Sequence, residues 1–316
     1  MRLRAVAAAV LAAAVVFAAE NLAVLGLFPH LARMTTDFSA SYLDRELRAD
    51  AAGPARTVFL GDSVLWGYRL AQADTAPSLL AARGCACSNL AFKSASPANY
   101  YGLARLLVAD RVRPSAVVIE INQQVFNPAN SSYQTLHPAV ATLAAPYFGP
   151  AEHALLGGSA ASPAEARWNE ALAALVPLYG MRSDLRETLY GDTSPAPVLN
   201  VLDGLYDLSP LDGTNVGVRF LTRTLAALRA ARIPVLAFLT PTNHRLMHEF
   251  IDVPEYRANL AYARRLCERG GARVLDLDAA FPAALFFDND HLTAAGQQRL
   301  AAVLAGALAQ RPPPRT

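Results

Sequence analysis

Apolar residues in this chain gather into five short continuous runs, separated by longer stretches that mix apolar and polar positions. The runs are bounded by polar residues, proline or glycine, and they cover residues 58–60, 87–92, 115–122, 233–241 and 272–278. Short, branched and continuously apolar runs are typical of parallel β-strands that are buried on both faces. Four of the intervening stretches predict helices, at residues 100–111, 216–232, 255–271 and 293–310.

Strands that alternate with helices imply right-handed crossover connections and a sheet covered on both faces. The sequence therefore predicts an α/β fold, a three-layer sandwich around a five-stranded parallel sheet, over residues 55–310. Residues 127–215 break the alternation, because they carry prolines and aromatic residues but no strand-like run. We expect a largely helical insertion there, with one helix starting at the N-cap Ser162. Residues 311–316 are predicted to form a disordered tail.

The N-terminal segment is the most apolar part of the chain. Two arginines, Arg2 and Arg4, precede a largely apolar run that reaches residue 28, about the ~20 residues needed to cross a bilayer. The sequence predicts a transmembrane anchor over residues 1–30, although Glu20 and Asn21 lie inside it. A cleavable signal peptide is the alternative. A polar helical stalk is expected over residues 31–54.

Arginines at the N-terminus favour a cytoplasmic location for that end. The expected location is therefore the inner (cytoplasmic) membrane, crossed once, with the domain in the periplasm or extracellular space. The formal net charge is only +2, and the chain has no basic run with interleaved aromatic residues. This composition argues against nucleic acid as a partner.

The chain has only three cysteines, Cys85, Cys87 and Cys267. An odd and small number does not predict a disulfide framework. The spacing of Cys85 and Cys87 would place them on one face of a strand, as small core residues. Metal binding would need more ligands at short spacing than these two supply.

Polar residues with catalytic potential follow the predicted strands. Ligands and catalytic groups on open α/β sheets lie at the carboxyl ends of the strands. At those ends stand Ser63, Ser94, Asn122 and, before the last helix, Asp288 and His291. A serine, an amide, a carboxylate and an imidazole at one edge are the groups that a serine hydrolase requires.

Asp288 and His291 are three positions apart, so that a tight turn or a first helical turn brings them together. Asp288 would fix the imidazole tautomer and leave the other ring nitrogen for the hydroxyl of Ser63. Asp290 is adjacent to the histidine and is the alternative partner. His244 and His248 have the i, i+4 spacing of a metal-binding pair, but the sequence offers no third ligand and we expect surface positions.

Four segments, FLGDSVLWG (59–67), NLAFKSASP (89–97), VVIEIN (117–122) and FFDNDHLTAAG (286–296), resemble in order the four signature blocks of the SGNH (GDSL-like) hydrolases. The resemblance implies a flavodoxin-like strand order, with Ser63 as nucleophile, His291 as base and Asp288 as its partner. The Ser63 N–H and the Asn122 side chain would donate to the oxyanion.

Two blocks depart from the family pattern. Where the second block normally has an oxyanion glycine, this chain has Ser94 or Ala95, and the glycine of the third block is replaced by Glu120. Losing one oxyanion donor typically lowers the rate by ~10²–10³. A backbone N–H of Ser94 can replace the donor if the loop permits.

The N-terminal segment and the turn Thr240-Pro241-Thr242-Asn243 are similar to those of an envelope subgroup of this family. Its members work beside membrane-bound O-acyltransferases, as in alginate O-acetylation and teichoic-acid D-alanylation. The resemblance implies an esterase or O-acyltransferase acting on an acylated envelope glycan or polymer through an acyl-serine, with no cofactor or metal. A non-catalytic scaffold for such an acyltransferase and a lipase-like esterase are the alternatives.

Overall fold

The computed structural model describes residues 2–27, 38–109, 114–130, 133–157 and 208–310, with single positions between 168 and 206. Its centre is a five-stranded sheet in the order β2-β1-β3-β4-β5, in which every neighbouring pair is parallel. The predicted strands and their order are confirmed. Their bounds are Thr57–Leu60 for β1, Cys87–Asn89 for β2, Ala116–Ile121 for β3, Val235–Leu239 for β4 and Arg273–Asp276 for β5.

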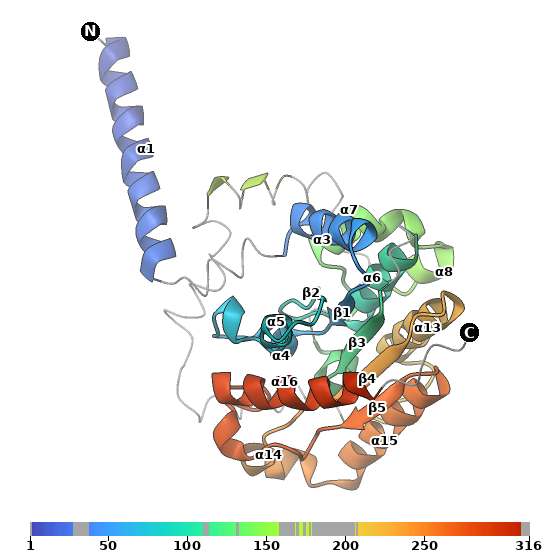
Figure 1. Cartoon of the computed structure of the whole chain (residues 1–316). Coiled ribbons are helices and arrows are strands. Elements are labelled where there is room, and N and C mark those ends of the chain that lie inside the picture. The colour runs from blue at the N-terminus through green and yellow to red at the C-terminus, as the bar shows by residue number, and fades with distance from the viewer. Residues whose placement is uncertain are drawn as a thin grey trace.

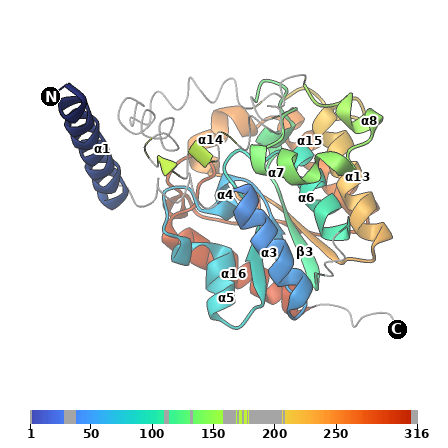
Figure 2. The same cartoon turned by 90° about the horizontal axis from the view of Figure 1, so that it is seen from above.

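Helices cover both faces of this sheet, as Figures 1 and 2 show. Helices α5 and α16 pack together on one face, and α6 packs against α13 on the other. The helices of the domain are α3 Ala40–Ala52, α4 Ser63–Trp66, α5 Ala76–Ala82, α6 Pro97–Ala109, α7 Pro138–Ala144, α8 Pro150–His153, α13 Val216–Ala230, α14 His244–Ile251, α15 Pro254–Arg269 and α16 Ala294–Ala309. Short 3₁₀ turns lie at Gln72–Asp74, Gln123–Phe126, Ala145–Tyr147 and Ala283–Leu285.

The core lies between these layers, and every side chain of β1 and β3 is buried. Such strands form from β-branched and aromatic residues, which pack well on a pleated surface. Strand β5 is the exception, because it lies at the edge of the sheet and its side chains are half-buried or exposed. Glu120 is the one charged residue of the buried strand β3.

Helix α3 comes from the segment predicted as a stalk. Its residues Leu43 and Leu47 are buried in the main core, and the helix packs against α7. The Tyr42 hydroxyl donates to the Asn89 carbonyl oxygen at 2.9 Å, which ties the helix to the end of β2. This part of residues 31–54 therefore packs onto the domain.

The N-terminal segment forms the helix α1, Arg2–Leu27. Among the residues that the structure describes, no helix has both the length and the apolar character needed to cross a membrane. The predicted transmembrane anchor is therefore not supported. The apolar run is interrupted at Glu20 and Asn21, where the Asn21 amide donates to the Phe17 carbonyl oxygen.

Part of the predicted insertion at 127–215 is helical, in α7 and α8. Helix α7 packs on α6, where Gly102 leaves the space that a Val140 methyl group occupies. Ser162 and most of residues 158–205 lie outside the described residues, but positions 168, 171, 172, 175 and 178, which fall in the helix predicted to start at Ser162, are described and are helical. The predicted tail at 311–316 also lies outside the described residues.

The cysteine prediction was wrong in one respect. Cys85 and Cys87 form a disulfide, with their Cα atoms 5.4 Å apart, whereas Cys267 is a buried free thiol. Cys85 precedes β2 and Cys87 is its first residue. Because the backbone is not yet in the strand at Cys85, the two side chains can meet instead of projecting in parallel from one strand face.

Replacing Gly61 with alanine should destabilise the fold. An added Cβ would overlap Glu120 Oε2 and lie 2.7 Å from Leu65 Cδ1, and both side chains are buried in the core. We expect Gly61→Ala to lower the free energy of unfolding by ~1–3 kcal/mol, measured by urea denaturation. Gly213→Ala is the matched control, since nothing lies within 4 Å of its added Cβ. Equal stability of the two variants would contradict the argument.

Candidate active site

The carboxyl end of β1 presents Ser63 on a sharp turn. Asp62 is the N-cap of α4, and its side chain accepts from the Val64 N–H at 3.0 Å. Ser63 is thus the first residue of the helix, where its own N–H has no intrahelical acceptor. Among the described residues, no group accepts from this N–H. The turn therefore leaves both the hydroxyl and the N–H of Ser63 available at the end of the sheet.

The structure brings Ser63, His291 and Asp288 together. The Nε2 of His291 lies 2.8 Å from Ser63 Oγ, across 228 positions of sequence. The Nδ1 of the same ring lies 2.8 Å from Asp288 Oδ2 and 3.0 Å from Oδ1. The His291 N–H also donates to Asp288 Oδ1 at 2.9 Å, which closes the turn between the two residues. This is the hydrogen-bonded chain of nucleophile, base and orienting carboxylate that acyl transfer requires.

Asp290 lies beneath the same imidazole. Its Oδ1 is 3.5 Å from His291 Nδ1, farther than Asp288, and this buried oxygen accepts no hydrogen bond from the described residues. Burial raises the pKa of Asp290, the His291 charge opposes this, and the charges of Asp288 and Asp62 add to it; the net pKa is about 6. The nearest carboxylate partner of His291 is therefore Asp288, as predicted, with Asp290 as a second negative charge.

The electrostatic environment favours the imidazolium form of His291. Burial alone would lower the pKa of His291, but the charge of Asp290 and the hydrogen bond and charge of Asp288 outweigh it. The net result is a pKa of about 9. Potential ligand atoms of Asp288, Asp290 and His291 also lie within 4.8 Å of one another. The proton shared by His291 and Asp288 accounts for this closeness, so we assign no metal to these residues.

Asn122 follows β3 and lines the pocket, but its side chain is already engaged. The amide donates to Asp62 Oδ2 at 3.0 Å and to Asp290 Oδ2 at 2.8 Å. Its oxygen accepts from the Gln124 N–H at 3.1 Å. Both amide hydrogens are needed by buried carboxylates, so the predicted oxyanion role would require one of these bonds to break.

Ser94 also lines the pocket, with Ala95 and Ser96. Its φ of 60° is in the left-handed region, which glycine enters freely and other residues seldom adopt. Ser94 thus has a backbone conformation that glycine favours, in the region where the sequence resemblance led us to expect a glycine. Within the described part of the chain, no group accepts from its N–H. Of the predicted oxyanion donors, the N–H groups of Ser63 and Ser94 therefore remain free to donate to an oxyanion, whereas the Asn122 amide already donates to two carboxylates.

Glu120 supports the turn that carries Ser63, but the sequence analysis did not identify it as a site residue. Its Oε2 accepts from the N–H groups of Asp62 and Leu65, both at 3.1 Å, and the Thr240 hydroxyl donates to Oε1 at 3.3 Å. The side chain is fully buried, and burial, followed by the Asp62 charge, raises its pKa well above the usual value. The signal that could have identified Glu120 is its position as a single charged residue in an otherwise apolar strand.

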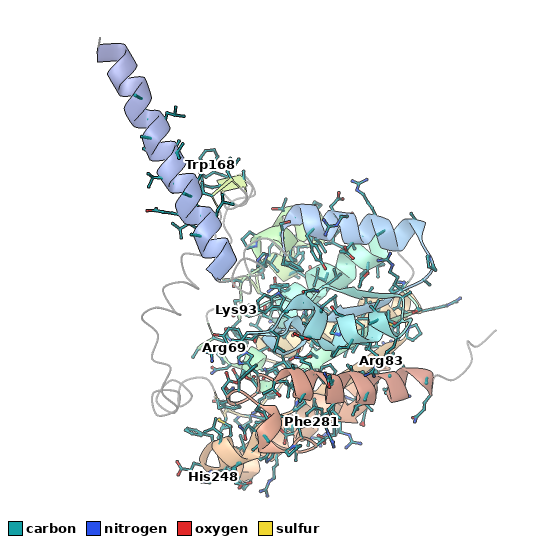
Figure 3. All side chains as sticks on the ribbon, turned by 60° about the vertical axis from the view of Figure 1, so that its left-hand side comes forward. Arg69, Arg83, Lys93, Trp168, His248 and Phe281 are labelled. Carbon is teal, nitrogen blue, oxygen red and sulfur yellow. A yellow bond between two sulfur atoms is a disulfide. The ribbon has the colours of Figure 1, made fainter. Side chains whose placement is uncertain are left out.

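Tyr68 packs beside the imidazole of His291. Its ring lies 4.4 Å from the His291 ring, centroid to centroid, at an interplanar angle of 38°. Gly67, with φ 85°, makes the turn possible, and the N–H groups of Gly67 and Tyr68 both donate to the Ser63 carbonyl oxygen. Arg69 and Lys93, labelled close together in Figure 3, lie over the Tyr68 ring at 5.2 and 5.6 Å.

The turn after β4 forms hydrogen bonds with the loop that carries His291. The Asn243 side-chain amide donates to the Asp288 carbonyl oxygen at 2.9 Å, and its backbone N–H donates to the Asn289 carbonyl oxygen at 2.7 Å. Asn243 also caps α14 by accepting from the Leu246 N–H. The predicted Thr240–Asn243 turn thus positions the backbone of Asp288.

A small pocket of about 120 Å³ opens at Ser63 and His291. It lies well below the ~300–1,000 Å³ of sites that enclose drug-sized ligands. Its lining residues are Asp62, Ser63, Ser94, Ala95, Ser96, Asn122, Gln124, Val125, Asn130, Asn289, Asp290 and His291. The cavity therefore has room for a small group at the nucleophile.

Comparison with known proteins gives similarity to solved structures only. No protein-family model matches the chain, and no curated protein matches it. One similar structure is a protein of the G-D-S-L family from Desulfitobacterium hafniense DCB-2, at 12% identity and TM-score 0.40, covering 80% of this chain and 98% of the other. A second is TesA, at 14% identity and TM-score 0.39, with coverage of 80% and 98%.

A third is a variant of Axe2, an acetyl-xylooligosaccharide esterase from Geobacillus Stearmophilus, at 12% identity and TM-score 0.41, covering 84% of this chain and 99% of the other. At these identities and scores, the similarities carry no argument about function. The activity is therefore argued from the geometry around Ser63.

The rate of an esterase reaction at this site should rise with pH up to about 9. His291 accepts the Ser63 proton only when Nε2 is unprotonated, and its raised pKa keeps the ring protonated at lower pH. Asp290→Asn removes the largest influence that raises this pKa and leaves an oxygen to accept from Asn122. We expect the rising limb of kcat/KM for p-nitrophenyl acetate to move to lower pH by about one unit or more.

Asp74→Asn is the control for this shift, because it removes an exposed carboxylate that does not act on His291. Its pH profile should match that of the unaltered chain. An unchanged profile in Asp290→Asn would show that another group controls the rate.

Proposed function

We propose that this protein is a serine esterase that cleaves short acyl esters through an acyl-serine intermediate. The observation that carries the proposal is the hydrogen-bonded chain from Ser63 Oγ through both ring nitrogens of His291 to Asp288. A serine hydroxyl is a weak nucleophile until an adjacent base removes its proton. Here the base lies at hydrogen-bond distance and its orientation is fixed by a carboxylate.

The reaction begins when Ser63 Oγ forms a bond to the acyl carbon and its proton passes to His291 Nε2. The electron pair of the C=O bond moves to the oxygen, where the N–H groups of Ser63 and Ser94 donate to the oxyanion. Collapse expels the alkoxide, which takes the proton from His291. Water, or the hydroxyl of a second molecule, then attacks the acyl-serine in the same way. Hydrolysis and acyl transfer thus use the same groups.

The size of the pocket favours a short acyl group. A cavity of about 120 Å³ accommodates an acetyl group but not a long alkyl chain. A lipase-like esterase needs an extended apolar channel, whereas this pocket is lined mainly by polar side chains. The acetyl or similarly short ester is therefore the substrate that we propose.

The alcohol part of the ester is proposed to be an envelope glycan or polymer. The Cys85–Cys87 disulfide supports a location outside the cytoplasm, because disulfides persist mainly in oxidising compartments. The resemblance of the Thr240–Asn243 turn to the envelope subgroup supports the polymer and a membrane-bound O-acyltransferase as a partner. The intact hydrogen bonds of Ser63 and His291 favour an enzyme over a non-catalytic scaffold.

Fluorophosphonate labelling of the full chain tests the nucleophile. We expect labelling at Ser63, identified by peptide mass spectrometry, because only an activated serine displaces the leaving group quickly. His291→Ala should reduce the labelling rate by ~10²-fold or more, and His248→Ala, which changes an exposed histidine, should not. A folded protein that is not labelled at Ser63 would refute the esterase proposal.

Acyl chain length tests the size of the pocket. We expect kcat/KM to fall at least about tenfold from p-nitrophenyl acetate to p-nitrophenyl octanoate, because the longer chain cannot enter the pocket. The initial rate of p-nitrophenol release measures both substrates under one set of conditions. A preference for octanoate would favour the lipase-like alternative instead.

A further inference from the structure

A second and larger cavity lies between α14, α15 and the carboxyl end of β5. Figure 1 shows where these three elements lie in the fold. The volume of the cavity is about 560 Å³, within the range of small-molecule binding sites. All of its lining residues belong to the described part of the chain, and none lines the pocket at Ser63. The mechanism proposed above makes no use of this cavity.

The base of the cavity is a fixed polar network. The buried carboxylate of Asp278 accepts from the Tyr256 hydroxyl at 2.6 Å, and its other oxygen lies 2.8 Å from His244 Nε2. Burial and the Asp278 charge raise the pKa of Tyr256, so the hydroxyl remains a donor. Because Nε2 of His244 faces Asp278, Nδ1 is the ring nitrogen left for a ligand, and 37% of this side chain is exposed. The network presents a pre-oriented polar group to the cavity.

The walls combine planar polar groups with small apolar ones. Arg257, Arg264 and Asp276 supply charges of both signs, and Leu260 and Ala280 supply apolar surface. Arg264 Nε donates to Glu268 Oε1 at 2.9 Å, and Arg257 Nη2 donates to Asp252 Oδ1 at 3.5 Å. Each guanidinium has five N–H donors in a fixed plane, so further N–H groups remain for a ligand, whereas carboxylates accept. Mixed donors and acceptors beside apolar patches match the alternating hydroxyl and C–H surfaces of a sugar ring. A simple anion or an apolar chain would use only one part of this lining.

The cavity is connected to the candidate active site through one turn. Thr242 donates its N–H to the Asp278 carbonyl oxygen, and its hydroxyl lies 3.3 Å from the Tyr256 hydroxyl. The next residue, Asn243, holds the backbone of Asp288 and Asn289. The cavity and the loop that carries the base therefore share a rigid support.

We propose that this cavity is a saccharide-binding subsite, which holds an unacylated sugar unit of the glycan whose ester reaches Ser63. The proposal rests on the proposed esterase function for the role of the sugar, but not for its binding. His244 and Arg264 make the polar contacts, and the side of the ring packs on Ala280 and Leu260.

Saturation-transfer NMR on the full chain carrying Ser63→Ala tests the binding. The probes are xylotetraose, cellotetraose and N-acetylated chitotetraose at millimolar concentration, none of which is an ester. We expect transfer to at least one of them, with affinity weakened about tenfold or more by Arg264→Ala or Ala280→Trp. Arg265→Ala and Ala284→Trp are matched controls, since both change exposed residues outside the cavity and should leave the affinity unchanged.

The two proposals fail in different ways. Absence of transfer to all three probes, or transfer that Arg264→Ala and Ala280→Trp do not weaken, would overturn the subsite. Neither result would change the expectation that fluorophosphonate labels Ser63. Ala280→Trp should hydrolyse p-nitrophenyl acetate at the same rate as the unaltered chain. Loss of labelling with retained sugar binding would overturn the esterase and leave a saccharide-binding protein.

Discussion

The candidate active site depends on a buried carboxyl group, Glu120, beneath the turn that carries the nucleophile. One oxygen of this group accepts from two N–H groups, those of Asp62 and Leu65, and thereby fixes the start of α4. The close approach is possible because residue 61 is glycine. An apolar side chain at position 120 would leave these buried donors without an acceptor, which costs ~1–3 kcal/mol for each group. The position of Ser63 thus follows from a polar contact made inside the sheet.

Glu120 belongs to a group of buried carboxyl side chains that explains much of the rest of the site. Glu120, Asp62 and Asp290 are all buried, and the Asn122 amide lies between the last two. Carboxylates close to an imidazole favour its protonated form. The charge of Asp290, the hydrogen bond and charge of Asp288, and the charge of Asp62 raise the pKa of His291 despite its burial. The base is therefore stronger than a solvated imidazole, and Asn122 is engaged in holding the acids rather than an oxyanion.

The sequence predicted what depends on strand ends and short spacing. Ser63, Asp288 and His291 were predictable because parallel strands deliver their carboxyl ends to one edge and because a three-residue interval closes a turn. The hydrogen bonds of the Asn122 amide to Asp62 and Asp290 could not be predicted, because these carboxylates are 60 and 168 positions away in the sequence. The contact of Tyr68 with His291 depends on the left-handed turn at Gly67. The Cys85–Cys87 disulfide depends on where β2 begins, a boundary that an apolar run does not define.

The Thr242–Asn243 turn accounts for the division of the sheet edge into two sites. Because β4 lies between β3 and β5, the turn after it faces the Asp288 loop on one side and Asp278 on the other. A rigid hydrogen-bonded turn between two cavities fixes their separation, so a ligand spanning both must have a defined length and shape. A small ester satisfies only the pocket at Ser63, whereas a polymer chain can occupy both. Selectivity for a glycan over a simple ester would then arise from binding energy at the larger cavity, used to place the acyl group at Ser63.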